Sequence, residues 1–402
     1  MSRPNARPSP ARLPLARYLV AAAILAFGGA IAATASAQPA GGVRSEVVAG
    51  QLQNPWALAF LPEGRFLVTE RAGRMRVVGA DGKAGEPLAG LPKIAAGGQG
   101  GLLDVVTDSG FARNRTVYFC YSEPAATGSG NSTALASATL SADNTRLDNL
   151  KVLFSQKPKV ASSGHFGCRI VESRAPGANG AAGAPDGKLF LTLGERMSRK
   201  EDAQKLDNHH GKVVRINKDG SVPQDNPFVG KAGALPEIWS YGHRNMQGAT
   251  LAPDGTYWTH EHGPQGGDEI NLPQPGRNYG WPAITFGENY GGGKMGDGST
   301  AKEGMEQPLH YWVPSIAPSG MAFLSSDKYG KAWQGNLFVG SLKFGYLDRI
   351  ELAQPFKGKV VRESKLLPGE RIRDVREGPD GLLYVLTDST DGKLIRLLPS
   401  GS

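Results

Sequence analysis

The chain has little cysteine and no long apolar run beyond its N-terminal region. It contains two cysteines in 402 residues, with no CxxC motif and no cluster of Cys and His, which argues against a zinc site. Its 55 glycines and 28 prolines follow no triplet period, which excludes a collagen-like chain. Short apolar runs recur along the whole sequence and argue against disorder. Many turn-forming residues between such runs instead favour an all-β protein.

The N-terminal region predicts a secretory signal peptide over residues 1–37. Four arginines without an acidic residue precede an apolar run from Tyr18 to Ala33, and Ala35-Ser36-Ala37 resembles a cleavage site. The alternative, a retained membrane anchor, needs about 20 apolar residues, and this run is shorter. We therefore expect a periplasmic or secreted domain over residues 38–402, without stable membrane insertion after cleavage.

The remaining charge is modest. The leader holds four of the arginines, so its removal lowers the formal net charge from +8 to +4. That charge is too dilute for a nucleic-acid-binding surface, so no nucleic-acid partner is expected. In an oxidising compartment Cys120 and Cys168 either form a disulfide or remain two buried thiols, and the sequence leaves both alternatives open.

One structural unit recurs six times in the mature chain. An apolar strand is followed by a turn, usually with Gly and once with Asn near Arg113-Asn114, and then by a β-branched and aromatic strand. A third strand follows most of these hairpins. The pattern predicts a six-bladed β-propeller, whereas the alternative, a β-sandwich, has no need of six similar units. The first strands are predicted at 56–60, 101–106, 168–171, 249–251, 320–324 and 372–375.

Propeller geometry places the start of each first strand and the end of each second strand on one face. The residues at these positions are nearly all polar, although they flank the most apolar strands of the chain. A concentration of Arg, Lys, His and Gln at one channel mouth predicts a pocket for a polyanionic ligand. Each residue alone is equally explained as a solvated loop residue. The positions are Glu70, Arg71, Gln99, His165, Glu195, Arg196, 242–245, 260–264, Lys343, Arg371 and Arg373.

Two local segments indicate chemistry. His165 lies in a Gly-rich segment and is a candidate general base, oriented by a carboxylate such as Glu195. The alternative is a core histidine bonded to the backbone. Residues 260–269 form a short, acidic, Gly-rich segment whose carboxylates and carbonyls suit Ca²⁺, or which is simply an acidic turn.

Several motifs together resemble a known family, the soluble PQQ-dependent aldose (glucose) sugar dehydrogenases, which are six-bladed propellers exported to the periplasm. The similarity extends from about Asn54 to Leu397. The strings Gly-His-Arg-Asn at 242–245 and Asn-Tyr-Gly-Trp-Pro at 278–282 are the most specific. The others lie at 98–103, 165–167, 211–217, 261–264, 268–272 and 371–374.

The resemblance implies a role for individual residues. His165 would be the catalytic base, and Glu195 stands where the family commonly has an aspartate. Main-chain carbonyls of Gly263 and Pro264 would bind a catalytic Ca²⁺, while Glu269 and Tyr279 resemble a second calcium site. Arg244 would also support negative charge developing on the quinone. The residues expected to hold the cofactor PQQ are Gln99, Arg244, Asn245, Tyr290, Lys343, Arg371 and Arg373.

The sequence thus predicts an exported enzyme that oxidises the C1 hydroxyl of an aldose to the lactone, with hydride passing to PQQ. A separate, unidentified acceptor would then take the electrons from the reduced cofactor. One alternative is a calcium-dependent propeller lactonase or esterase, which needs carboxylate and Asn ligands on the channel axis. The basic channel residues count against it. The other alternative, a non-catalytic sugar-binding propeller, needs neither His165 nor the arginine cluster.

Overall fold

The computed structural model describes residues 42–177 and 182–400. The expected signal peptide at 1–37 and the first residues of the predicted mature domain lie outside the described residues. Within the described ranges, no helix has both the length and the apolar character needed to cross a membrane. The unit from residue 41 onward is described below.

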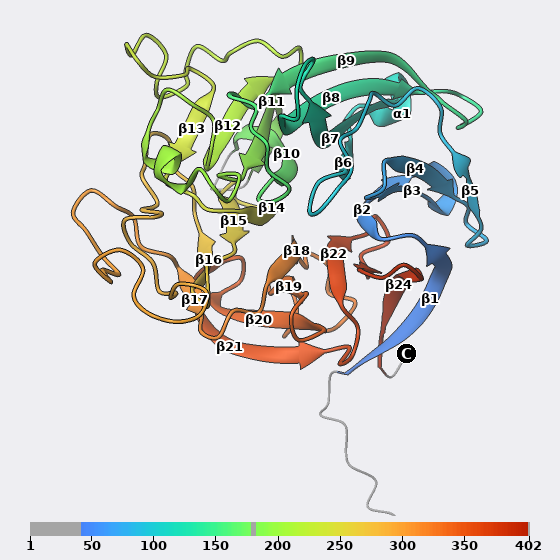
Figure 1. Cartoon of the computed structure of the whole chain (residues 1–402). Coiled ribbons are helices and arrows are strands. Elements are labelled where there is room, and N and C mark those ends of the chain that lie inside the picture. Colours follow the sequence, from blue (N-terminus) through green and yellow to red (C-terminus); the bar gives the residue numbers. More distant parts are fainter. Residues whose placement is uncertain (1–41, 178–181, 401–402) are drawn as a thin grey trace, which may run out of the picture. The chain divides into compact units, whose positions relative to one another are not determined.

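Six four-stranded antiparallel sheets form a ring, which confirms the predicted six-bladed β-propeller (Figure 1). The first three sheets, or blades, contain β2 (Pro55–Leu61), β3 (Arg65–Glu70), β4 (Arg74–Val78) and β5 (Ala84–Pro87); β6 (Leu102–Thr107), β7 (Thr116–Pro124), β8 (Asn131–Leu140) and β9 (Leu147–Ser155); and β10 (Gly167–Pro176), β11 (Ala182–Leu193), β12 (Lys212–Asn217) and β13 (Ile238–Tyr241).

The next two blades follow the same order, with each blade's strands consecutive in the chain. They contain β14 (Met246–Leu251), β15 (Tyr257–Glu261), β16 (Asp268–Asn271) and β17 (His310–Trp312); and β18 (Pro318–Phe323), β19 (Leu337–Ser341), β20 (Tyr346–Gln354) and β21 (Lys357–Leu366).

The sixth blade joins the two ends of the described chain. It is built from β22 (Ile372–Glu377), β23 (Leu383–Thr387) and β24 (Gly392–Pro399), with β1 (Val43–Leu52) as its outer strand. β1 runs antiparallel to β24, and the pairing extends from Val43 opposite Pro399 to Leu52 opposite Gly392. The ring is therefore closed by hydrogen bonds between its first and last strands.

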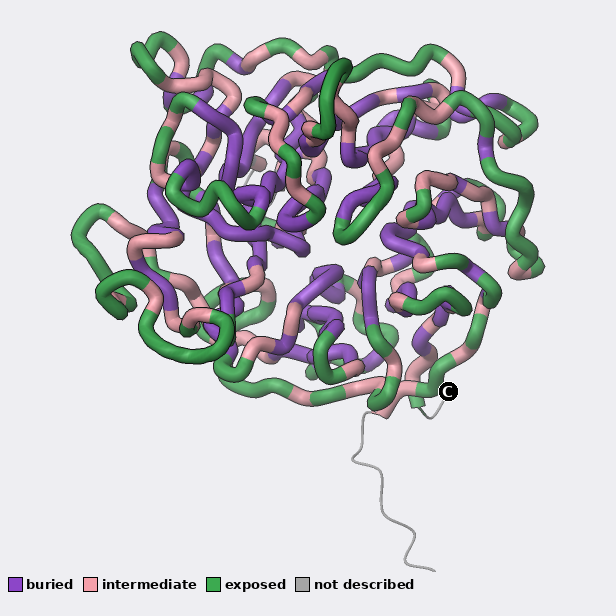
Figure 2. Tube along the Cα trace, viewed as in Figure 1, coloured by how far each residue is buried: buried purple, intermediate pink, exposed green. Residues whose placement is uncertain are grey.

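Burial decreases from the inner strand to the outer strand of each blade. Six of the seven residues of β2 are buried, whereas β21 has none that is fully buried (Figure 2). The inner strands face neighbouring blades on both sides and are therefore largely buried, including the charged side chains of Asp104, Arg169 and Asp374. One predicted turn differs: residues near Arg113-Asn114 form a one-turn helix, α1 (Phe111–Asn114), which ends at Arg115 in the left-handed conformation with φ +51°.

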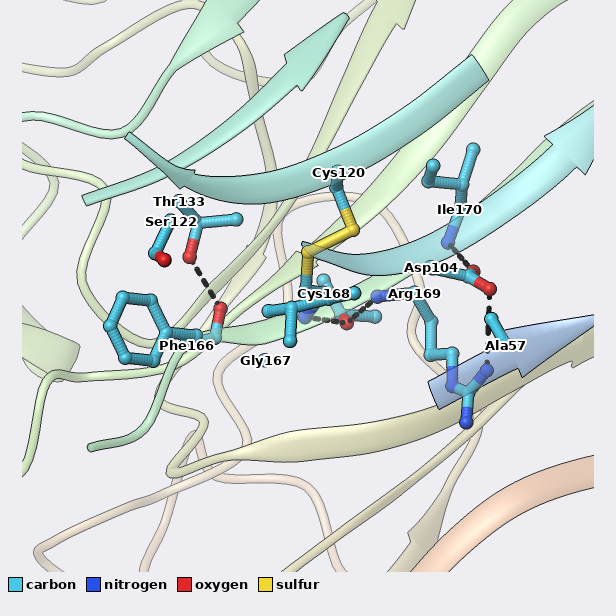
Figure 3. Close-up of a disulfide and its surroundings, with 12 residues drawn as sticks. Ala57, Asp104, Cys120, Ser122, Thr133, Phe166, Gly167, Cys168, Arg169 and Ile170 are labelled. Atoms are coloured by element: carbon cyan, nitrogen blue, oxygen red, sulfur yellow. Dashed lines mark hydrogen bonds and ion pairs between the residues drawn. A yellow bond between two sulfur atoms is a disulfide. The ribbon is translucent and has the colours of Figure 1, made fainter. Parts of the chain in front are cut away.

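The two cysteines form a disulfide, so the alternative of two free thiols is wrong. Cys120 lies in β7 and Cys168 in β10, and their sulfur atoms are 1.98 Å apart (Figure 3). The bond joins the second and third blades. It also anchors β10 directly after the segment that carries His165.

Candidate functional site

A cavity of about 370 Å³ opens at the channel mouth where the inner strands begin. All six blades contribute to its lining, as the propeller geometry predicts. Five of the residues predicted to hold a ligand lie in its wall, interleaved with the apolar side chains of Trp56, Leu103 and Phe166. Those five are Gln99, Asn245, Lys343, Arg371 and Arg373.

Positive charge in this cavity exceeds negative charge. Arg373 is 7% exposed and donates from Nη2 to Asp388 Oδ2 at 2.8 Å, while Arg371 Nε donates to the same oxygen at 3.0 Å. One carboxylate thus serves two guanidinium groups, and Lys343 adds a third cation. Burial lowers the pKa of Arg373, and the charge of Asp388 opposes that shift. The Nε atom of Arg373 is buried without a hydrogen-bond partner in the described part of the chain.

Arg244 lies beside this cavity, under the exposed ring of Tyr290. Its Nη1 donates to the carbonyl of His262 at 3.1 Å, and its Nη2 donates to the Tyr290 hydroxyl at 3.2 Å. Tyr290 is 69% exposed, so it lies at the rim. Like that of Arg373, the Nε atom of Arg244 is buried and finds no partner among the described residues. The structure therefore brings Arg244 and Tyr290 together and leaves the Nε donor of Arg244 unused.

His165 and Glu195 form a buried pair at the same mouth. Their side chains are 5% and 1% exposed, and Nδ1 of His165 lies 3.0 Å from Oε1 of Glu195. Burial lowers the pKa of His165; Glu195 opposes the shift, and the charges of Arg244 and Arg196 add to it. Across the described residues, no hydrogen bond engages Nε2 of the imidazole, so a neutral ring has a free acceptor there.

Close packing of the main chain keeps this pair in place. Gly194 precedes Glu195 and passes so near the histidine segment that a Cβ on it would lie 2.2 Å from the His165 carbonyl. The main-chain N–H of His165 donates to Oε1 of Gln99 at 2.8 Å, and Asn245 Oδ1 accepts from the N–H of Gly167 at 3.1 Å. Two of the predicted cofactor residues thus also shape the histidine segment.

The residues predicted to bind calcium lie around a second, ion-sized cavity of about 10 Å³. Gly263, Glu269 and Tyr279 line it, and His262 lines both cavities. Pro264, beside Gly263, does not line either cavity but is buried. The described ranges contain no cluster of three or more His, Cys, Asp or Glu that would hold a metal. A cation here would therefore also need main-chain oxygens.

The donor chemistry at this small cavity fits a hard cation. Burial and the neighbouring Glu261 raise the pKa of Glu269 to about 8, and Asn271 has a buried Oδ1 without a partner in the described chain. The hydroxyl of Tyr279 donates to the Leu272 carbonyl, which leaves its main-chain carbonyl as the available oxygen. The buried Glu261 and the half-buried Glu269 both line the small cavity, and carboxyl oxygens are the hard donors that Ca²⁺ prefers.

Sequence reasoning missed a second group of residues beneath the mouth. Gln247 and Trp56 line the cavity. The sequence could have indicated Gln247, because it lies two residues after Asn245, and alternate residues of a strand point to the same side. Deeper in the channel, Arg169 and Arg376 from β10 and β22 contact Asp104 and Asp374 from β6 and β22. We call these four residues the axial ion network.

Fold and site together define a class of protein: a six-bladed propeller with a cationic ligand cavity at one channel mouth and a buried histidine–glutamate pair beside it. The sequence profile of the family described as "Glucose / Sorbosone dehydrogenase" matches residues 52–396. The chain belongs to the glucose/sorbosone dehydrogenase family. The fold and the oxidoreductase class predicted from the sequence are thereby confirmed.

Individual relatives agree with this assignment. The chain is 44% identical to aldose sugar dehydrogenase YliI of Escherichia coli over 365 residues, which cover 89% of this chain and 93% of the relative. The apo-form crystal structure of the E. coli soluble aldose sugar dehydrogenase matches 89% of this chain and 99% of its own with a TM-score of 0.82 and 43% identity. The PQQ-bound aldose sugar dehydrogenase of Streptomyces coelicolor matches 90% of this chain and 100% of its own with a TM-score of 0.69 and 25% identity.

Proposed function

We propose that the protein oxidises the C1 hydroxyl of aldose sugars to lactones, with PQQ as its cofactor and Ca²⁺ as its metal. The observation that carries the proposal is the cationic cavity beside the His165–Glu195 pair, where Arg373 in its wall and Arg244 beside it keep unused buried donors. Family membership and the PQQ-bound relative support the same assignment.

The lining of the cavity suits the proposed cofactor in its charge and its apolar walls. PQQ carries three carboxylates, and guanidinium groups bind carboxylates through forked pairs of N–H donors. Arg371, Arg373 and Lys343 would bind carboxylates at one end, with Gln99 and Asn245 beside them, and the Trp56 and Phe166 rings provide apolar walls. When bound, PQQ supplies a two-electron acceptor for hydride.

The chain's own residues supply the proton chemistry and the electrostatics. Burial lowers the pKa of His165 and so favours the neutral imidazole, whose Nε2 would accept the proton of the C1 hydroxyl as the sugar is oxidised. Glu195, at 3.0 Å from Nδ1, would hold the ring orientation and stabilise the imidazolium that forms. Arg244, buried at the same mouth, would stabilise negative charge that develops in the cavity.

Calcium is the proposed metal because the available donors are hard oxygens. Gly263 and Pro264 would contribute main-chain carbonyls to a catalytic ion, and Glu269 with the Tyr279 carbonyl would hold a second ion in the small cavity. No side chain other than hydrogen fits at Gly263, because a Cβ there would lie 2.1 Å from the Gly266 carbonyl oxygen.

Reconstitution tests the proposal. Purified apo-protein would be incubated with PQQ and Ca²⁺, and dye reduction would be measured with a panel of aldoses. We expect activity with several aldoses only when both PQQ and Ca²⁺ are added. Mg²⁺ should not restore activity in place of Ca²⁺, because Mg²⁺ requires a tighter octahedral shell. Full activity after exhaustive chelation would contradict the calcium assignment, and inactivity of the loaded protein with every aldose would contradict the function.

The cellular setting is also a proposal. The basic and apolar leader and the disulfide between Cys120 and Cys168 both favour an exported, oxidising compartment, periplasmic or secreted. There the substrate would be a free aldose, and a separate electron acceptor would reoxidise the cofactor.

A further inference from the structure

Arg196 is a buried cation that the proposed mechanism does not use. It is 0% exposed, and no carboxylate in the described chain lies within ion-pair distance of it. Its Nε and Nη1 atoms are buried without hydrogen-bond partners within the described ranges. An unpaired buried charge is costly, so a purely structural role would be served better by a neutral side chain.

Two other stacked arginines show what a structural arginine looks like in this fold. Arg349 stacks at 4.3 Å over Trp333 and pairs with Glu351 at 2.8 Å. Arg215 stacks at 4.2 Å over Trp239 and pairs with Asp225 at 2.8 Å. Both donate from Nε to an Asn side chain. Arg196 shares the stacking and an Asn partner, Asn131, but no carboxylate in the described chain lies within ion-pair distance of its guanidinium.

Arg196 contacts the segment that carries His165, and its Nη2 also donates to Oδ1 of Asn131 at the start of β8. The guanidinium lies 3.6 Å from the centroid of the Phe166 ring, and its Nη2 donates to the Ser162 carbonyl at 2.7 Å. In return, the Ser162 hydroxyl donates to the Arg196 carbonyl at 2.8 Å, and the Arg196 N–H donates to the His165 carbonyl at 3.3 Å. The side chain and main chain of Arg196 thus hold the segment from both ends.

This segment needs external support. His165 has φ +50° and Cys168 has φ +90°, a region of backbone space that non-glycine residues seldom occupy. Arg196 itself has φ +66°. Such conformations persist only where surrounding contacts determine them, and they gather at functional sites.

We propose that Arg196 is a positioning residue for His165, which clamps the 162–166 segment and so holds the imidazole in place beside Glu195. Four charged or titratable groups face His165: Glu195, Arg196, Arg244 and His262. Glu195 favours the charged imidazole, whereas Arg196 and Arg244 oppose it and lower the pKa of His165 together with burial. Loss of Arg196 therefore shifts the balance toward the imidazolium.

The first test needs no cofactor. The ring of His165 would be titrated by NMR in ¹⁵N-histidine-labelled apo-protein, with the signal assigned by its absence in His165→Gln. In Arg196→Met the midpoint should move to higher pH than in the wild type. Arg349→Met is the matched control, because it removes an equally stacked arginine far from this segment, and it should leave the midpoint unchanged.

The second test, which rests on the proposed function, uses the enzyme loaded with PQQ and Ca²⁺. A neutral base is lost as pH falls through its pKa, so the acid limb of kcat should move to higher pH in Arg196→Met. We expect kcat to fall roughly 10²-fold from misplacement of the base, with KM changed much less. Arg196→Lys keeps the positive charge but not the planar guanidinium, so the His165 titration midpoint should stay at its wild-type value while kcat falls. This variant also serves as the test if Arg196→Met does not fold.

The outcomes separate the two proposals. An unchanged His165 midpoint in Arg196→Met, or a midpoint in Arg196→Lys displaced as far as in the Met variant, would overturn the role of Arg196. A wild-type protein that binds PQQ but oxidises no aldose would overturn the proposed function, while the NMR titration would still decide the role of Arg196.

Discussion

Two layers of arginines follow one another along the channel, and they differ in charge balance. In the axial ion network, Arg169 Nη1 lies 2.8 Å from Asp374 and 3.3 Å from Asp104, and Arg376 contacts both aspartates as well. At the mouth, Arg371 and Arg373 share the carboxylate of Asp388, and no carboxylate of the described residues pairs with Lys343 or Arg244. Figure 3 shows Arg169 and Asp104 close to the disulfide.

The difference separates structure from binding. In the axial ion network two arginines are matched by two aspartates, so no net positive charge is left to bind an anionic ligand. The network also connects three blades of the propeller. An excess of cations with unused donors remains incomplete until an anion arrives. The same residue type therefore has two functions at two depths, and the count of nearby carboxylates distinguishes them.

The largest effect is expected at the mouth, from His165→Ala. The variant should still bind PQQ and Ca²⁺, but its single-turnover reduction by sugar should slow roughly 10²–10⁴-fold, because a general base contributes that much. Stopped-flow absorbance of the loaded enzyme measures it, with His165→Gln as a polar variant of similar reach. A wild-type rate in folded, loaded His165→Ala would remove this residue from the mechanism.

The next effect concerns the lower layer. Arg169→Ala leaves Asp104 and Asp374 buried with one cation between them, so the free energy of unfolding should fall by about 3–5 kcal/mol. Denaturant unfolding of the apo-protein measures the loss. Arg362→Ala, which removes an arginine that is 63% exposed, is the control and should change little. Equal stabilities for the two variants would show that the network does not support the ring.

Arg373→Ala should show the opposite behaviour. PQQ binding should weaken by about 2–5 kcal/mol, as for truncation of one partner of a buried charge pair. Apo stability should change less, because Asp388 retains Arg371. Titration of the apo-protein with PQQ gives the affinity. If stability collapses while affinity holds, the two layers have the same role and the comparison fails.

The smallest effect is expected at the rim, from Tyr290→Phe. It removes one hydroxyl that accepts from Arg244 at 3.2 Å on a largely exposed ring. The loss in PQQ affinity should be about 0.5–1.5 kcal/mol. A loss greater than that of Arg373→Ala would place the main cofactor contacts at Arg244 instead of at Arg373.

The sequence predicted much of the mouth because blade geometry is regular. Once the six hairpins are recognised, the positions before the first strand and after the second are known to converge, which is how Gln99, Lys343 and Arg371 were found. Their roles as cofactor contacts stay predictions. The signal is local, since each hairpin carries its own turn and its own apolar runs.

The axial ion network could not be read in the same way. Asp104, Arg169 and Asp374 each interrupt an apolar inner strand, which is a visible signal, but their pairing depends on the relative rotation of blades far apart in sequence. The disulfide was undecided for the same reason, since Cys120 and Cys168 meet only when adjacent blades are in register. The pairing of β1 with β24 joins residues about 350 positions apart and leaves no local pattern.

The closing pair of strands has a consequence for the order of assembly. A nascent chain releases β1 first, yet the partner of β1 is the last strand to be made, so the sixth sheet stays open until the whole polypeptide is present. Meanwhile β1 has an unpaired edge of the kind that promotes association between chains. Because β1 pairs with β24, the sixth blade cannot be completed before the last strand of the described chain has been made. Removing residues 43–52 would then produce a ring that opens at one seam, with five complete blades and a three-stranded sixth.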